Sequence, residues 1–311
     1  MLVATGGTAK ADPFDAYDSR ASGATASYLR DAQVYALHGQ YSGAIRTLDG
    51  VLADHPNSVV ARFQRGRALM DSGRYDTAID DFSRVIASYP EYGDSYFTRG
   101  EAYLRAKNVP LAMADFNMAI KVVVGEIIPK RNVGVFSGLD RDFHPRSVWE
   151  NTLLNANIHS NRGLAYELTG DSTLKLADFK YGMGQVDGNI QGWTMLREKC
   201  ANAALIDLLD SALAACNDSI DRHPHDFISV GNRGLIYLKK GQWNLAIADY
   251  NSALNSNPET SYLLYGRGIA KRAIGDRAGG DADMAAGVRL EPDIANIMAR
   301  WGVRGVVLAR G

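Results

Sequence analysis

Apolar residues recur at spacings of three and four over most of the chain, which places them on one face of a helix. No segment alternates strictly enough to indicate a strand. Glycine stands where several apolar segments stop, as in Ser-Gly-Arg-Tyr at 72–75 and Lys-Gly-Gln-Trp at 240–243. Because glycine readily ends a helix, the pattern predicts an all-α chain of short helices joined by tight turns.

The helical pattern repeats with a period of 34 residues. Prolines at 56 and 90, and again at 224, 258 and 292, mark this period, since each closes a stretch with the same order of small and apolar residues. Repetition at this length predicts a solenoid, in which each helical hairpin contacts only its neighbours. The register gives seven units, at 25–58, 59–92, 93–126, 156–189, 193–226, 227–260 and 261–294.

Small and large residues hold fixed positions within the units. Small side chains at positions 8 and 20, counted from the first residue of a unit, let two antiparallel helices approach closely. Position 24 usually carries a large residue that fills the space beside them. Position 8 holds Ala32, Gly66, Gly100, Gly163, Cys200, Gly234 and Gly268, and position 24 holds Leu48, Phe82, Phe116, Phe179, Cys216, Tyr250 and Met284.

This arrangement resembles the tetratricopeptide repeat. Units two, three, six and seven match the family's pattern well, whereas unit four carries Lys175 in place of an alanine. The resemblance covers about three quarters of the chain. It implies a right-handed α-solenoid whose first helices line a concave groove for a protein or peptide. The match is most complete at Gly234-Leu235-Ile236-Tyr237, Ala246, Tyr250, Ala253 and Pro258.

The groove implied by the resemblance can be mapped onto the first helix of each unit. Aromatic and aliphatic residues interleave there with arginines, as in surfaces that recognise peptides or partner proteins. The alternative for the apolar members is packing between helices. The candidate partner-binding residues are Phe63, Arg67, Phe97, Glu101, Arg105, Asn161, Leu164, Asn232, Lys239, Tyr262, Tyr265 and Arg272.

Two segments flank or interrupt the units. Residues 127–155 form an insertion, which we expect to pack beside the groove and shape it; the alternative is a loop without a binding role. Residues 295–311 are predicted to form a helix that caps the last hairpin. If its apolar face stays exposed, that face becomes a contact in a homodimer, and the chain would be a self-associating structural component. The insertion residues that we expect beside the groove are Phe136, Arg141, Phe143 and Trp149.

A charge pattern follows the repeat. Position 7 is arginine in five units, and the same five carry aspartate at position 23, whereas the other two units have neither. We interpret this as an ion pair between the two helices of a hairpin, which fixes the hairpin's geometry rather than marking a binding site. The pairs are Arg65 with Asp81, Arg99 with Asp115, Arg162 with Asp178, Arg233 with Asp249, and Arg267 with Asp283.

The two cysteines bear on the cellular compartment. Cys200 and Cys216 stand at positions 8 and 24 of one unit, where its helices pack most closely, so they either form a disulfide or act as small buried hydrophobic residues. Residues 1–24 show no helical period. The segment Ala9-Lys10-Ala11 either ends a signal peptide at residue 11 or matches that pattern by chance. Together these features favour a periplasmic or secreted protein of the bacterial envelope over a cytoplasmic one.

Charge and motifs narrow the classes of function. The 311 residues carry a net charge of −1, so no basic field favours nucleic acid, and no run of about 18 apolar residues indicates a membrane span. Metal-ligand spacings, phosphate-binding loops and nucleophile elbows are missing, so no cofactor or metal is expected. An enzyme would have to use insertion residues such as Asp140, Asp142 and His144. The sequence therefore predicts a non-catalytic scaffold that binds a protein or peptide.

Overall fold

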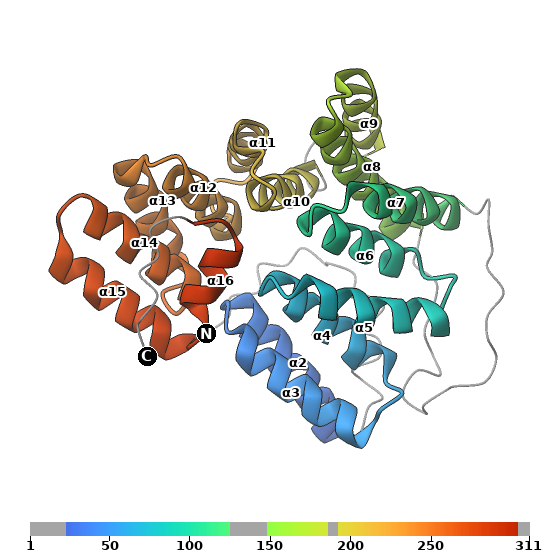
Figure 1. Ribbon diagram of the computed structural model, residues 1–311, viewed down its shortest axis with the longest axis horizontal. Helices are drawn as coiled ribbons and strands as arrows, with labels where there is room; N and C mark the ends of the chain where they lie inside the picture. Colours follow the sequence, from blue (N-terminus) through green and yellow to red (C-terminus); the bar gives the residue numbers. More distant parts are fainter. Residues whose placement is uncertain (1–22, 125–147, 186–191, 304–311) are drawn as a thin grey trace.

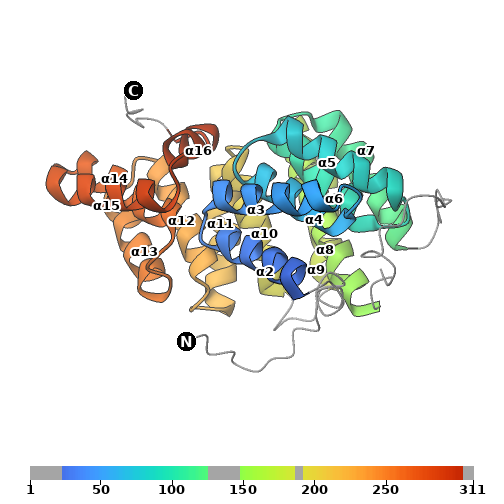
Figure 2. The same ribbon diagram turned by 90° about the horizontal axis from the view of Figure 1, so that it is seen from below.

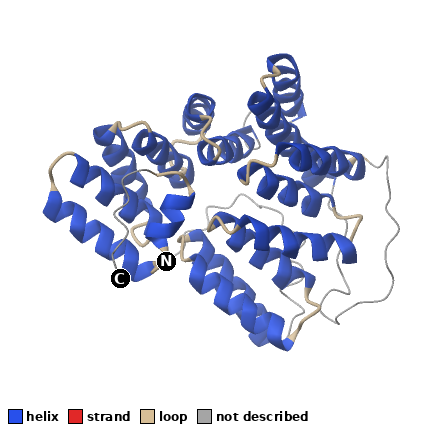
Figure 3. Cartoon of the chain, viewed as in Figure 1, coloured by secondary structure: helices blue, strands red, loops and turns tan. Residues whose placement is uncertain are grey.

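The computed structural model describes residues 23–124, 148–185 and 192–303. These residues form α-helices joined by short turns, and no strand occurs among them (Figure 3). The prediction of an all-α solenoid is confirmed. The helices are α2 (Gly23–Leu37), α3 (Tyr41–Asp54), α4 (Val59–Asp71), α5 (Tyr75–Ser88), α6 (Gly93–Arg105), α7 (Val109–Val123), α8 (Val148–Thr169), α9 (Ser172–Gln185), α10 (Gly192–Leu205), α11 (Leu209–Arg222), α12 (Phe227–Lys239), α13 (Trp243–Ser256), α14 (Ser261–Ala273), α15 (Arg277–Leu290) and α16 (Ile294–Arg300).

Consecutive helices pair into hairpins, from α2 with α3 to α14 with α15, and each hairpin packs on the next. The turn inside a hairpin needs a residue in the left-handed region, which glycine adopts without strain. Gly73 (φ +77°) and Gly241 (φ +72°) occupy this place. In units three and five the same place holds Lys107 (φ +61°) and Asp207 (φ +68°), and these two side chains form an ion pair at 3.3 Å.

Close helix packing inside a hairpin depends on the small residue at position 8. A Cβ atom on Gly100 would lie 2.7 Å from Cε1 of Phe116, whose ring is fully buried against this glycine. In unit five the same two positions hold Cys200 and Cys216. They form a disulfide with Cα atoms 5.0 Å apart, which is the first of the two alternatives that the sequence leaves open.

Hydrogen bonds from the repeated arginines join the hairpins to one another. Each arginine at position 7 donates from Nε and Nη2 to both oxygens of the aspartate at position 23, over 2.7–2.8 Å. Its Nη1 donates to the side chain at position 25 of the preceding unit, over 2.7–3.0 Å. We call this series the arginine ladder. Its acceptors at position 25 are Asp49, Ser83, Asn117, Asn217 and Asn251.

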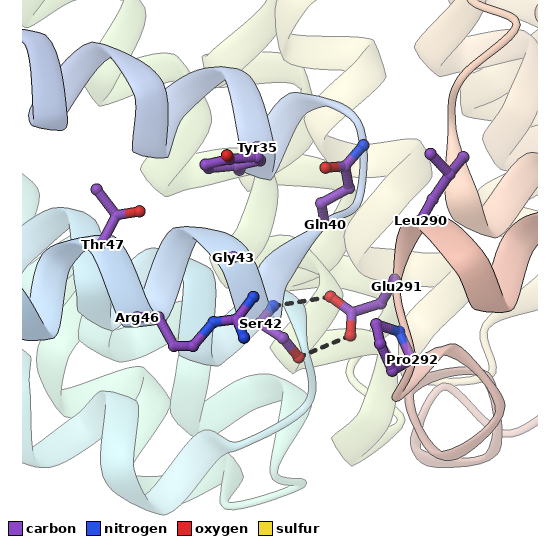
Figure 4. A pocket seen from close by; sticks show the side chains of 9 residues that line it. All are labelled: Tyr35, Gln40, Ser42, Gly43, Arg46, Thr47, Leu290, Glu291 and Pro292. Atoms are coloured by element: carbon purple, nitrogen blue, oxygen red, sulfur yellow. Dashed lines mark hydrogen bonds between the residues drawn. The ribbon is translucent and has the colours of Figure 1, made fainter.

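The seven hairpins wind around a centre, so that the first hairpin lies near the last (Figures 1 and 2). Two sets of bonds join these ends. The main-chain N–H and hydroxyl of Ser42 in α3 donate to the carboxylate of Glu291 at 2.7 and 2.6 Å, beside a pocket of about 150 Å³ (Figure 4). The N–H of Ser261 donates to the carbonyl oxygen of His38 at 3.1 Å, and its hydroxyl donates to that of Gly39 at 2.9 Å.

Helix α16 completes this junction from the C-terminal side, where Figure 1 shows it between α14 and the first hairpins. The indole Nε1 of Trp301 donates to the carbonyl oxygen of Asp71 at 2.9 Å, and Nε of Arg300 donates to the carbonyl oxygen of Ser72 at 2.7 Å. Tyr41 and Tyr262 contact the Trp301 ring in edge-on geometry. We call the bonds of Ser42, Ser261, Arg300 and Trp301 to the opposite end of the array the closure contact.

Helix bounds differ from the sequence register at two places. Helix α8 starts at Val148 and runs for 22 residues, so its first part occupies the end of the segment assigned to the insertion. Helix α16 covers Ile294–Arg300 only and ends in a turn at Gly302 (φ +82°), because glycine there takes the left-handed conformation. Besides capping the last hairpin, α16 contacts the first two hairpins through the closure contact.

Several predictions on the insertion fall outside the described residues. This applies to the candidate groove residues Phe136, Arg141 and Phe143, and to Asp140, Asp142 and His144. Trp149 belongs to α8, and only its helical backbone is described. Residues 1–22, with the cleavage-like segment, also lie outside the described part.

Candidate binding groove

The first helices of the hairpins enclose a cavity of about 560 Å³, which we call the inner cavity. Its wall comes from α2, α4, α6, α8, α10, α12 and α14, joined by Tyr41 of α3 and by Trp301 after α16. This size lies within the range of about 300–1,000 Å³ that is usual for ligand-binding pockets. Seven of the twelve candidate partner-binding residues line it, namely Phe63, Arg67, Phe97, Glu101, Arg105, Asn232 and Tyr262.

The other five candidates lie elsewhere. Asn161, Leu164 and Tyr265 are buried in helix packing. The ammonium of Lys239 donates to the carbonyl oxygens of Ala204 (2.7 Å) and Trp301 (2.9 Å) and pairs with Asp207 at 2.6 Å. It therefore links α12 to α10 and to the residue after α16. Arg272 does not line the cavity; it is exposed and lies 3.4 Å from Asp281.

A buried polar network crosses one side of the inner cavity. Asn202 of α10 is its centre: its Nδ2 donates to Glu101 and to Asn161, both at 2.6 Å, and its Oδ1 accepts from Nε of Arg105 at 2.9 Å. Nη1 of Arg105 donates to Asp71 at 2.8 Å. Three residues that the sequence assigns to partner binding are thus engaged with one another through Asn202. Asn202 stands at position 10 of its unit, to which the repeat pattern gives no role.

Glu101 is 6% exposed, and burial raises the pKa of its carboxyl group to about 7. The Arg105 guanidinium opposes this rise, the Glu198 carboxylate adds to it, and the hydrogen bond from Asn202 opposes it. At neutral pH the inner cavity therefore holds a carboxyl group that is close to its titration midpoint.

We expect the free energy of unfolding of the wild-type protein to fall by about 2 kcal/mol as pH rises from about 5 to about 7, because Glu101 loses its proton in this range. The unfolded chain releases this proton near the ordinary pKa, whereas the folded state keeps it until the raised pKa. The contribution is therefore full below the unfolded pKa and is lost as pH rises through about 7. The variant Glu101→Gln, which retains an acceptor for Asn202, is expected to lack this loss.

Urea unfolding at several pH values measures the effect. The matched control is Glu259→Gln, which changes an exposed glutamate between α13 and α14 and is expected to keep the wild-type pH profile. Identical profiles for wild type and Glu101→Gln would contradict the expectation.

Three amide side chains in the cavity wall carry buried polar atoms without a hydrogen-bond partner among the described residues. These atoms are Oε1 of Gln64 in α4, Oδ1 of Asn157 in α8 and Nδ2 of Asn232 in α12. A buried polar atom without a partner costs about 1–3 kcal/mol, so a ligand that supplies the missing partner gains this free energy. Gln64 and Asn232 both stand at position 6 of their units, a signal that could have paired them from the sequence; Asn157 has no such signal.

Neither a metal site nor a membrane-spanning helix is found among the described residues. No group of three or more His, Cys, Asp or Glu side chains within them could hold a metal ion. Within the same part of the chain, no helix has both the length and the apolar character of a membrane span.

Comparisons with solved structures find several proteins of low sequence identity. A tetratricopeptide repeat protein from Parabacteroides merdae is 13% identical, with 90% of this chain and 100% of that chain covered and a TM-score of 0.44. YrrB, a TPR protein with an unusual peptide-binding site, is 11% identical, with coverage of 70% and 95% and a TM-score of 0.37. The MamA protein is 19% identical, with coverage of 76% and 92% and a TM-score of 0.35. No curated protein sequence matches this chain significantly.

Family models agree with the repeat register. Two overlapping matches described as tetratricopeptide repeat cover residues 29–80 and 63–122, and a third covers residues 229–260. They fall on hairpins in both halves of the array, and three of the matched units have the glycine at position 8 in contact with the large residue at position 24. The chain therefore contains tetratricopeptide repeats in both parts of the array.

Proposed function

We propose that this protein is a non-catalytic scaffold that binds a short extended peptide segment of a partner protein in the inner cavity. The observation that carries the proposal is the set of three buried amide atoms, on Gln64, Asn157 and Asn232, that have no hydrogen-bond partner within the described part of the chain. The same wall also holds aromatic and charged side chains. Tetratricopeptide repeats support the coarser role of a protein-interaction scaffold.

The chemistry of the wall suits a peptide. An extended peptide carries N–H donors and carbonyl acceptors at regular spacing, and its unpaired main-chain groups need both donors and acceptors on the receptor. Asn232 supplies a donor, while Gln64 and Asn157 supply acceptors. Phe63, Phe97 and the other aromatic residues of the wall then offer contacts for apolar side chains of the peptide.

A peptide array tests the proposal directly. The full chain is applied to short peptides of random sequence, and selected peptides are titrated in solution by fluorescence anisotropy. We expect selected sequences to share apolar positions and to compete with one another, since they occupy one cavity. If no peptide binds, or if those that bind are unaffected by changes in the cavity wall, the proposal fails.

The variant Asn232→Ala is expected to weaken binding of a selected peptide by about tenfold, because it removes the buried donor that the peptide main chain would satisfy. Asn255→Ala is the matched control, since Asn255 is an exposed asparagine of α13. Titration of the same labelled peptide with both variants gives the ratio. Equal affinities would show that the peptide does not use this amide.

We also propose that the protein works in an oxidising compartment, as a periplasmic or secreted protein. The disulfide between Cys200 and Cys216 supports this, because such bonds persist where thiols are not kept reduced. Thiol alkylation of the protein directly from cell fractions tests it. Recovery of both cysteines as free thiols would contradict the location.

A further inference from the structure

The closure contact differs in character from the contacts between neighbouring hairpins. Hairpins pack through continuous clusters of buried apolar side chains and through the arginine ladder. The closure contact consists mainly of hydrogen bonds to main-chain oxygens and to one carboxylate, beside an ion pair of Arg74 with Asp293 at 3.8 Å. Its apolar part is small: Tyr41 of the first hairpin joins the buried cluster of the last hairpins, against the ring of Trp301. Hydrogen bonds that water can replace contribute little net free energy, so this contact can open while the hairpins stay folded.

The acceptors of the closure contact lie at helix ends. The carbonyl oxygens of His38 and Gly39 belong to the turn between α2 and α3, and those of Asp71 and Ser72 to the end of α4. Helix ends expose such oxygens, which water can bond when the contact is open. The donors at the N-termini of α3 and α14 are equally accessible to water once the ends separate. Opening therefore leaves no polar group of the contact buried without a partner, except where Glu291 remains covered.

The contact also shares residues with the inner cavity. Trp301, Tyr41 and Asp71 line the cavity, and Trp301 joins the two ends of the array through its ring contact with Tyr41 and its indole hydrogen bond to Asp71. Tyr262 also lines the cavity and supports the Trp301 ring from the C-terminal end. Separation of the ends moves Trp301 away from Tyr41 and removes part of the cavity wall. A ligand that touches this wall binds the closed array more tightly than the open one, and by linkage it stabilises closure by the same factor.

We propose that the closure contact is a latch, which opens and closes as one unit and holds a peptide in the inner cavity when closed. The claim that the closure contact opens and closes as one unit stands on that contact alone. The claim that it holds a peptide, which we call the holding half, rests on the proposed function. Glu291 is the central residue of the latch, because its fully buried carboxylate accepts both hydrogen bonds from Ser42.

Amide hydrogen exchange of the full chain, followed residue by residue by NMR, tests the latch without any peptide. The N–H groups of Ser42 and Ser261 each donate across the closure contact, to different acceptors. The variant Glu291→Ala removes the acceptor of Ser42 and that of the Asp293 N–H at the start of α16, and it removes no acceptor of Ser261. If the latch opens as a unit, exchange of the Ser261 N–H also rises, by about tenfold, although Ser261 makes no bond to Glu291. Amides of α6 and α7, on the opposite part of the array, are expected to keep their rates.

The control is Glu259→Ala, which removes an exposed glutamate close to Ser261 in sequence. A faster exchange at Ser42 alone would show a local contact and overturn the latch. Equal acceleration of all amides, including those of α6 and α7, would show general destabilisation and overturn it as well. Trp301→Ala gives a second perturbation, since it is expected to raise exchange at Ser42, to which Trp301 makes no hydrogen bond.

A fluorescein-labelled copy of a peptide selected on the peptide array tests whether the latch holds a bound peptide. We expect its dissociation rate to rise about tenfold in Glu291→Ala, and we expect the unlabelled peptide to slow exchange at Ser42 and Ser261 in the wild type, although neither residue lines the cavity. Unchanged dissociation and exchange would overturn this half. If no array peptide binds, the proposed function fails and the exchange experiment still decides whether the latch exists.

Discussion

Replacing Phe116 by alanine is expected to lower the free energy of unfolding by about 3–5 kcal/mol. The ring is fully buried at position 24 of unit three, packs on Gly100 and lies 6.2 Å from the ring of Phe97. Its removal leaves a cavity that the surrounding helices can fill only in part, because Gly100, on which the ring packs, has no side chain that could move in. Urea unfolding followed by circular dichroism at the helix band measures the loss.

Leu111→Ala is the control for this variant. Leu111 belongs to the same helix, α7, but is 45% exposed, so its replacement is expected to change stability by less than about 0.5 kcal/mol. Similar losses for the two variants would mean that the pairing of a large residue with the glycine at position 8 does not determine hairpin stability. If amide hydrogen exchange in Phe116→Ala becomes faster only in α6–α9, and not in the terminal hairpins, the array unfolds one part at a time.

The hairpins could be predicted from the sequence because every unit repeats the same local solution. Gly100 and Phe116 are one instance of a contact that recurs at Gly66 with Phe82 and at Gly234 with Tyr250. Repetition in phase makes such a weak pattern specific. The same register made the disulfide one of two alternatives, since it places both cysteines of unit five at the two positions that touch in units two, three, six and seven.

The arginine ladder shows where a repeat pattern stops being informative. The bonds inside a hairpin were visible because arginine and aspartate appear and disappear together. The bonds to the preceding hairpin were not visible, because their acceptor at position 25 is aspartate, serine or asparagine. Any of these side chains can accept a hydrogen bond from a guanidinium, so the sequence varies while the interaction is retained.

The candidate groove was predicted only in part, for a different reason. The family's register identifies which side of each first helix faces inward, and seven candidates accordingly line the inner cavity. The register contains no information on how strongly the array curves. Curvature brings Asn202 to Glu101 and Ser42 to Glu291, pairs that are 101 and 249 residues apart in the chain and belong to no repeated pattern. For this reason Lys239 and Asn161 were assigned to a partner although they bond within the chain.

Replacing Cys200 and Cys216 together by alanine is expected to lower the free energy of unfolding by about 3 kcal/mol. The bond closes a loop with a sequence separation of 16 and joins α10 to α11 in the unit whose turn carries Asp207 in place of glycine. Cross-linking restricts the unfolded chain, so its loss favours unfolding. Alanine is smaller than cysteine, so it clashes at neither position, and it adds no buried polar group.

Reductant separates the contribution of the bond from that of the side chains. Dithiothreitol is expected to lower the urea midpoint of the wild type towards that of the double variant and to leave the double variant unchanged. Because α10 carries Asn202, the centre of the polar network, loosening of unit five is also expected to raise amide exchange in α6, across the cavity from the bond. A wild-type midpoint that does not respond to reductant under unfolding conditions would show that the disulfide does not stabilise the array, and exchange in α6 that stays unchanged would show that unit five is not coupled to the cavity wall.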